Sequence, residues 1–221
     1  MKAFRALFAI AALLVPATGF GAVGIYDAYA FTSLNGGGLS FYDIGAATGN
    51  PDFQGSTLGT FDRFTDALQL GGQQKSYKNN GSDVTGHTIF WRILELGGSF
   101  ASVNMPYQWD AFQPGAPGGL NNSGDQQWGG DSQGANGNPM ELSSNVFSGL
   151  LNGTYTLQVY TQISTNGNNA PSTLLNDNGG SYFSASFTLV PEPSKASFGM
   201  VGLLGFLLRS GRRCTADCLD S

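Results

Sequence analysis

The chain has very little of two residue types on which many catalytic and metal sites depend. Of its 221 residues, one is histidine (His87) and two are cysteine, Cys214 and Cys218, both close to the C-terminal end. A single histidine cannot build a multi-histidine metal site, and no Gly-x-Ser-x-Gly segment accompanies it. The Cys-x-x-x-Cys pair has no second pair of ligands for zinc. We therefore expect His87 to open a strand after a turn, the protein to have no cofactor, and the chain not to be an enzyme.

Charged residues are also scarce and unevenly distributed. They make up 11% of the chain, and between Val23 and Val190 four Lys or Arg face twelve Asp or Glu, a net charge of −8. Nucleic-acid affinity rests mainly on Lys and Arg that neutralise phosphates. This balance excludes nucleic acid as the expected partner.

The apolar run at the start of the chain is too short to span a membrane. Two cations precede an apolar stretch at residues 7–15, and small residues follow it. This is the layout of a secretory signal peptide, whereas a membrane span needs about 20 apolar residues. We expect residues 1–22 to form a signal helix that signal peptidase removes by cleavage after Gly19 or Gly21.

A second short apolar segment lies near the other end. The sequence VPEPS begins at Val190, an apolar stretch containing glycine follows at residues 196–208, and an arginine cluster comes directly after it. Because positively charged residues stay on the cytoplasmic side, such a segment would leave the body outside. We expect a short C-terminal transmembrane helix whose length is marginal for a full span.

This three-part ending resembles the PEP-CTERM sorting signal. Its elements here are the motif, the apolar stretch and the arginines: Pro191, Glu192, Pro193, residues 196–208, Arg209, Arg212 and Arg213. The resemblance implies a Gram-negative bacterial source, processing by a membrane protease-transpeptidase of the exosortase type, and a place in the envelope, extracellular matrix or biofilm. It covers residues 191–213 and departs from the family's pattern in a tail, residues 214–221. It implies passage through the cell-envelope membrane to the cell surface or matrix.

The body, residues 23–190, has the composition and patterning of an all-β protein. It is rich in turn-forming glycine and in aromatic residues, and apolar residues alternate with polar ones at residues 154–165 and 181–190. Residues 88–96 are apolar on both faces apart from Arg92, which indicates a central strand. Further strands are expected at residues 24–31, 38–42, 74–78 and 99–104. The pattern predicts an antiparallel β-sandwich of jelly-roll or immunoglobulin-like type.

Local signals refine this prediction. Asn80-Gly81, Asn152-Gly153 and residues 176–180 are typical of hairpin turns, and residues 141–151 are the best short helical candidate. Residues 56–93 also resemble domains of secreted bacterial β-sandwich proteins of unassigned role.

Aromatic residues suggest one binding function. Flat rings can stack on sugar faces, and loop aromatics are better ligand candidates than strand aromatics. Tyr107, Trp109 and Trp128 lie in segments expected to be exposed, whereas Trp91 lies in an apolar strand and is expected in the core. The first three are therefore candidate glycan-binding residues for an extracellular polysaccharide.

Carboxylates suggest two weaker alternatives. Asp125 and Asp131, in the irregular region 113–141, are weak calcium candidates whose spacing matches no EF-hand. A glycosidase needs two carboxylates about 5–10 Å apart, for which Asp62 and Asp66 are near neighbours. The main hypothesis is a non-enzymatic, exported envelope or extracellular-matrix protein; the alternatives are a carbohydrate-binding module and a secreted hydrolase.

Overall fold

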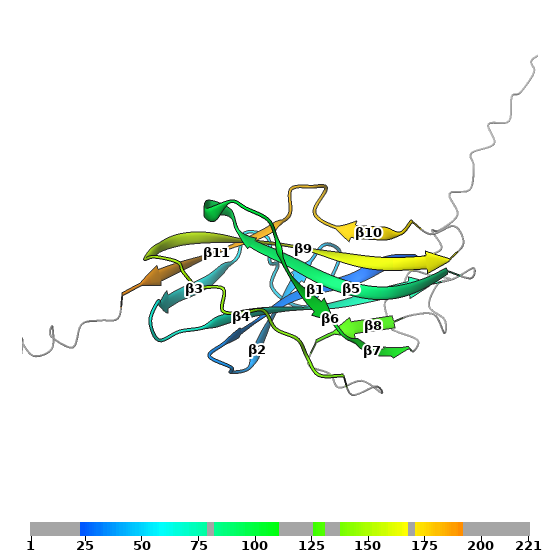
Figure 1. Cartoon of the computed structure of the whole chain (residues 1–221), viewed down its shortest axis with the longest axis horizontal. Coiled ribbons are helices and arrows are strands. Elements are labelled where there is room, and N and C mark those ends of the chain that lie inside the picture. Colours follow the sequence, from blue (N-terminus) through cyan, green and yellow to red (C-terminus); the bar gives the residue numbers. More distant parts are fainter. Residues whose placement is uncertain (1–22, 79–81, 111–125, 131–137, 168–170, 192–221) are drawn as a thin grey trace, which may run out of the picture.

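The body is all-β, as predicted (Figure 1). The computed structural model describes residues 23–78, 82–110, 126–130, 138–167 and 171–191. In chain order these contain β1 (Val23–Leu34), β2 (Leu39–Ile44), β3 (Thr57–Asp62), β4 (Leu68–Lys78), β5 (Ser82–Ile93), the 3-10 turn η1 (Leu94–Leu96), β6 (Ala101–Met105), β7 (Tyr107–Asp110), β8 (Gln126–Gly129), β9 (Gly153–Gly167), β10 (Thr173–Asn176) and β11 (Phe183–Val190). The predicted helix at residues 141–151 is wrong, because its described residues form turns and irregular backbone.

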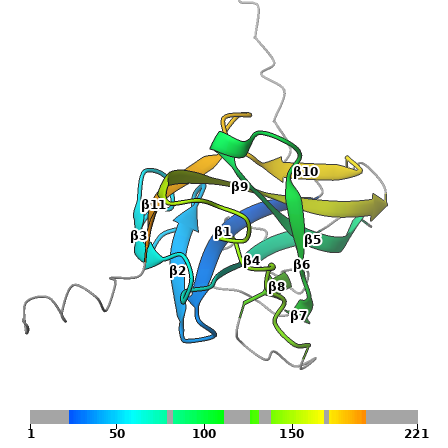
Figure 2. The ribbon, with the colours of Figure 1, turned by 60° about the vertical axis from the view of Figure 1, so that its left-hand side comes forward.

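The strands form two sheets, seen in two orientations in Figure 1 and Figure 2. The first sheet has the order β2-β1-β4-β8-β7, and the second has the order β3-β11-β9-β5-β6, with β10 beside β9. β5 lies between β9 and β6, so the central strand predicted at residues 88–96 is confirmed as far as Ile93, and Leu94–Leu96 form η1 instead. The prediction of purely antiparallel pairing is wrong at one edge, where β3 runs parallel to β11. Alternation along a strand shows which face is buried but contains no information about the direction of its neighbour.

Apolar side chains from both sheets meet in one core. Leu70 comes from the first sheet, and Ile89, Leu157 and Phe187 come from the second; all four are 0% exposed. Burying each such side chain stabilises the fold by about 1.5–3 kcal/mol. The β11 strand shows the predicted alternation, since every second residue is buried. Trp91, expected in the core, is partly buried and packs against it.

Two of the predicted hairpins are instead crossings between the sheets. β4 belongs to the first sheet and β5 to the second, so the connection that contains Asn80-Gly81 does not join paired strands. β9 begins at Gly153, but β8 before it also lies in the other sheet. Asn-Gly pairs favour any tight connection that needs positive φ. They do not determine which sheet the next strand joins.

β10 and β11 are two parts of one interrupted strand. β10 pairs with residues 161–164 of β9, and β11 continues along the same side of β9, opposite residues 153–159. The chain between them, residues 177–182, loops out opposite Tyr160. The predicted turn at residues 176–180 is therefore a bulge and not a hairpin, and the last strand begins at Phe183.

Both predicted terminal helices lie outside the described residues, as does the tail. The described part of the chain has no helix with the length and apolar character needed to cross a membrane. Of the sorting-signal residues, only Pro191 is described, and it is exposed. The others that fall outside are Glu192, Pro193, Arg209, Arg212 and Arg213.

Candidate functional site

Two of the three predicted glycan-binding residues lie together at one edge of the first sheet. β7 pairs with β8, which places Tyr107 opposite Trp128 and Trp109 opposite Gln127. The rings of Tyr107 and Trp128 meet edge to face, with centroids 5.1 Å apart. The prediction that Trp128 lies in an exposed loop is wrong: it is half-buried in β8. This strand has four residues amid glycine-rich sequence, which is too short to show clear alternation.

The indole of Trp128 lies on the imidazole of His87. Their rings stack with centroids 4.9 Å apart and planes 17° apart, and the indole N–H donates to Gln126 Oε1 at 3.1 Å. His87 is 0% exposed. It lies inside β5, which begins at Ser82, so the prediction that it opens the strand is wrong. The contact links β8 of the first sheet to β5, an interior strand of the second.

A chain of buried hydrogen bonds continues from His87. Its Nδ1 lies 2.8 Å from Gln74 Oε1 and its Nε2 lies 3.1 Å from Ser76 Oγ, while Gln74 Nε2 donates to Thr161 Oγ1 at 2.8 Å. An amide oxygen only accepts, so Nδ1 has the proton and Nε2 accepts from the Ser76 hydroxyl. Burial lowers the pKa of His87 well below 6.5, which keeps the ring neutral. This geometry gives His87 a structural role: it ties β4 to β5 and, through Gln74, to β9.

The carboxylates considered for hydrolysis make local structural hydrogen bonds. Asp62 Oδ1 accepts from the backbone N–H groups of Phe64 and Thr65, and Asp66 Oδ2 accepts from the backbone N–H of Asp62. Side chains of this kind commonly stabilise turns by bonding nearby backbone. These contacts secure the turn after β3.

Glu95 and Glu141 are used in a similar way. Both carboxylate oxygens of Glu95 accept from the backbone N–H of Thr156, at 3.0 and 2.9 Å, and Glu141 Oε1 accepts from Asn104 Nδ2 at 3.2 Å. Burial raises the pKa of Glu95, but the hydrogen bonds from Thr156 lower it by more, so the net shift is downward. The weak calcium candidates Asp125 and Asp131 lie outside the described residues. Within the described part, no group of three or more His, Cys, Asp or Glu side chains is arranged to hold a metal ion.

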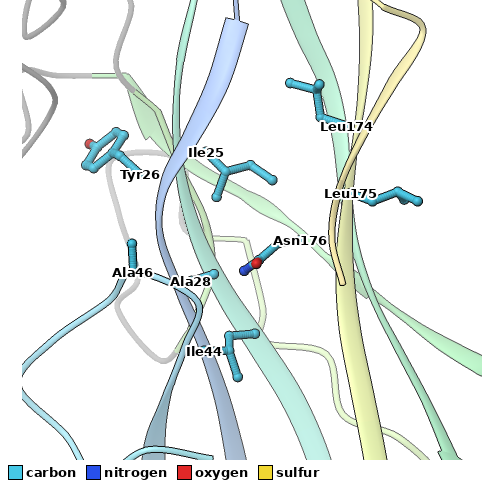
Figure 3. A pocket seen from close by; sticks show the side chains of 8 residues that line it. All are labelled: Ile25, Tyr26, Ala28, Ile44, Ala46, Leu174, Leu175 and Asn176. Atoms are coloured by element: carbon cyan, nitrogen blue, oxygen red, sulfur yellow. The ribbon is translucent and has the colours of Figure 1, made fainter. Parts of the chain in front are cut away.

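A groove of about 250 Å³ opens between the sheets beside β10 (Figure 3). Ile25 and Ile44 of the first sheet line one side, and Leu174, Leu175 and Asn176 of β10 line the other. Leu175 is 52% exposed. The lining is mainly apolar and contains neither carboxylate nor imidazole among its described residues, so its chemistry favours apolar contact.

No protein-family model matches the chain, and no curated protein matches it. Its functional interpretation therefore rests on its own residues and their geometry.

A second group of aromatic rings, on the outer face of the second sheet, was not predicted as a site. It includes Phe90, Phe100, Tyr160 and Tyr182, which come from four separate segments. The sequence contains one signal that could have indicated it: Phe90 and Tyr160 alternate with buried neighbours and therefore point outward. Their proximity depends on strand register, which the sequence does not reveal.

Proposed function

We propose that the protein is a non-enzymatic, exported β-sandwich protein of the cell envelope or extracellular matrix, sorted through its PEP-CTERM-like ending. The supporting observation is that the last described strand of the body ends where the motif begins. Val190 is the last residue of β11; it pairs with Asp62, and its carbonyl accepts from the backbone N–H of Arg63 at 3.1 Å. Pro191, the next residue, is exposed.

This junction suits processing of a folded protein. Proline has no N–H group and cannot continue a β-ladder, so Pro191 marks a physical stop for β11. A membrane enzyme of the exosortase type would find Pro191, the first residue of the motif, exposed while the body stays folded. Signal peptidase would act at the other end, and the C-terminal segment would hold the chain in the membrane until processing. We also propose that the two sheets form a sandwich of the jelly-roll or immunoglobulin-like type.

Replacing Pro191, Glu192 and Pro193 with alanines should change the mature C-terminus. In a Gram-negative host that contains exosortase, we expect the unmutated protein to lose the residues beyond its processing point and the variant to keep them. Intact-mass measurement of both proteins distinguishes these products. As a control, Pro171→Ala removes an exposed proline of the body and should leave the mature mass unchanged apart from the substitution. Identical C-termini in the unmutated protein and the triple variant would contradict the proposal.

A further inference from the structure

Four aromatic rings pack together on the outer face of the second sheet, where β5 and β9 lie side by side (Figure 1). Phe90 stacks on Tyr160, with centroids 4.7 Å apart and planes 4° apart. Phe100 meets the Tyr160 ring edge to face at 4.9 Å, and Tyr182 lies 4.8 Å from Phe100 and 5.4 Å from Tyr160. All four side chains are half-buried, so the cluster keeps part of its surface open. With Arg92, they form what we call the aromatic face.

Arg92 adds a positive charge to this face. Its guanidinium carbon lies 4.5 Å from the centroid of Phe100 and 5.4 Å from that of Tyr182. Its Nε donates to Gln158 Oε1 at 2.9 Å. These contacts fix the side chain through rings and a neutral amide, and its terminal nitrogens make no hydrogen bond with the described residues that would neutralise the charge.

The described lysines have carboxylate partners, whereas Arg92 has none within the described ranges. Both ion pairs among the described residues involve lysine: Lys75 with Asp27 and Lys78 with Asp83. In the part of the chain that is described, Arg92 therefore has no carboxylate within ion-pair distance. A guanidinium fixed in this way can make a paired hydrogen bond to a carboxylate brought by a ligand.

Tyr182 is held on the face by an unusual backbone conformation. Its φ is 60°, in the left-handed region that favours glycine. Its N–H donates to the carbonyl of Asp177 at 2.8 Å, and its carbonyl accepts from Asn178 Nδ2 at 3.2 Å. Backbone strain of this kind is concentrated at binding and catalytic sites. The bulge between β10 and β11 thus places a strained tyrosine against the other rings.

Polar side chains surround the rings on neighbouring strands. Ser102 lies opposite Phe90, Gln162 lies opposite Thr88, and Ser184 lies opposite Gln158. Rings pack on the apolar faces of sugars, while amides and hydroxyls bond sugar hydroxyl groups. Burial raises the pKa of the Tyr160 phenol, and neighbouring Tyr182 and the charge of Asp177 raise it further. The positive charge of the face is that of Arg92, which lies over the rings of Phe100 and Tyr182.

We propose that the aromatic face binds an acidic polysaccharide: sugar rings pack against the aromatic side chains, and a uronic-acid carboxylate pairs with Arg92. The charge of Arg92 complements such a ligand, although the whole body is acidic. This site is separate from Tyr107 and Trp128, which belong to the first sheet. It is also independent of the sorting proposal, because it concerns only the folded body.

The test is titration calorimetry of the full-length protein with two oligosaccharides of equal length, an oligogalacturonate and a neutral oligoglucan. We expect the oligogalacturonate to bind more tightly than the oligoglucan. Arg92→Gln should weaken its binding roughly tenfold, as expected for loss of a charged hydrogen bond, and remove the preference over the neutral ligand. Phe100→Leu should weaken the binding of both oligosaccharides severalfold.

A matched control is available in Arg63, whose guanidinium lies 4.7 Å from the exposed ring of Phe64. Arg63→Gln removes the same charge outside the aromatic face and should leave binding unchanged. Absence of oligogalacturonate binding by the unmutated protein would overturn the proposal, and so would an equal loss in both arginine variants. Sedimentation of the same samples supplies another outcome: if Arg92→Gln dissociates a dimer without affecting glycan binding, the face joins two copies of the chain and the proposal is wrong. Thermal unfolding identifies any variant that fails to fold. If Phe100→Leu fails to fold, the effect of Arg92→Gln on oligogalacturonate binding decides the proposal.

Discussion

The free energy of unfolding should fall by about 1.4 kcal/mol for each pH unit below about 6.5, because of His87. Burial lowers the pKa of this residue well below 6.5 in the folded state, whereas in the unfolded chain it has its ordinary value. As the pH falls below 6.5, the unfolded state therefore binds up to one proton more than the folded state. The stabilisation is complete above this pH and is lost as the pH falls toward the folded-state pKa. Urea unfolding at several values between pH 7 and pH 5 measures the slope.

His87→Gln provides the comparison for this measurement. Glutamine keeps a donor for Gln74 and an acceptor for Ser76 but does not titrate. Since the chain has one histidine, the difference between the two pH profiles in this range reports that residue. Carboxylates that begin to titrate near pH 5 affect both proteins alike. Parallel profiles would mean that His87 is protonated as readily in the folded protein as in the unfolded chain.

Gly129→Ala should lower the free energy of unfolding by about 3 kcal/mol or more. Gly129 ends β8, has a φ of 70°, and a Cβ built on it would lie 2.1 Å from the carbonyl oxygen of Gly72. A backbone oxygen cannot rotate away as a flexible side chain does, so β8 must shift. That shift would also disturb the stacking of the neighbouring Trp128 on His87. Urea unfolding monitored by tryptophan fluorescence reports both effects.

Gly149→Ala separates the two causes of this loss. Gly149 has a similar φ of 77°, but nothing lies within 4 Å of a Cβ added there. This control should cost only the conformational penalty, about 1 kcal/mol. Equal losses in the two variants would show that β8 does not pack as closely on β4 as the structure indicates.

The fold class and most strands were predictable because their signal is local. In β11, alternate residues such as Phe183 and Phe187 face the core, and this period is visible in the sequence. β3 gives a weaker signal, since only Phe61 is buried and Gly59 interrupts it with a φ of 137°. Its parallel pairing with β11 joins segments more than a hundred residues apart. No local pattern specifies such a partner.

The candidate sites were less predictable for the same reason. Tyr107 and Trp128 were proposed together, but His87 was considered alone because its stacking on Trp128 depends on how two sheets pack. Strand alternation places the side chains of Phe90 and Tyr160 on the outer face. Only the register of β5 against β9 brings them into contact. Tyr182 was expected within a strand, whereas it lies in the bulge that interrupts one.

The position of β11 also bears on how the body would respond to mechanical tension. The last described strand is an interior strand, bonded to β9 on one side and to β3 on the other. A tether attached beyond Val190 and pulled along the strand would load both ladders in shear, so several hydrogen bonds would resist together. An edge strand pulled sideways would instead lose its bonds one after another. A tether at this end of the body would thus load a part of the sheet suited to bearing force.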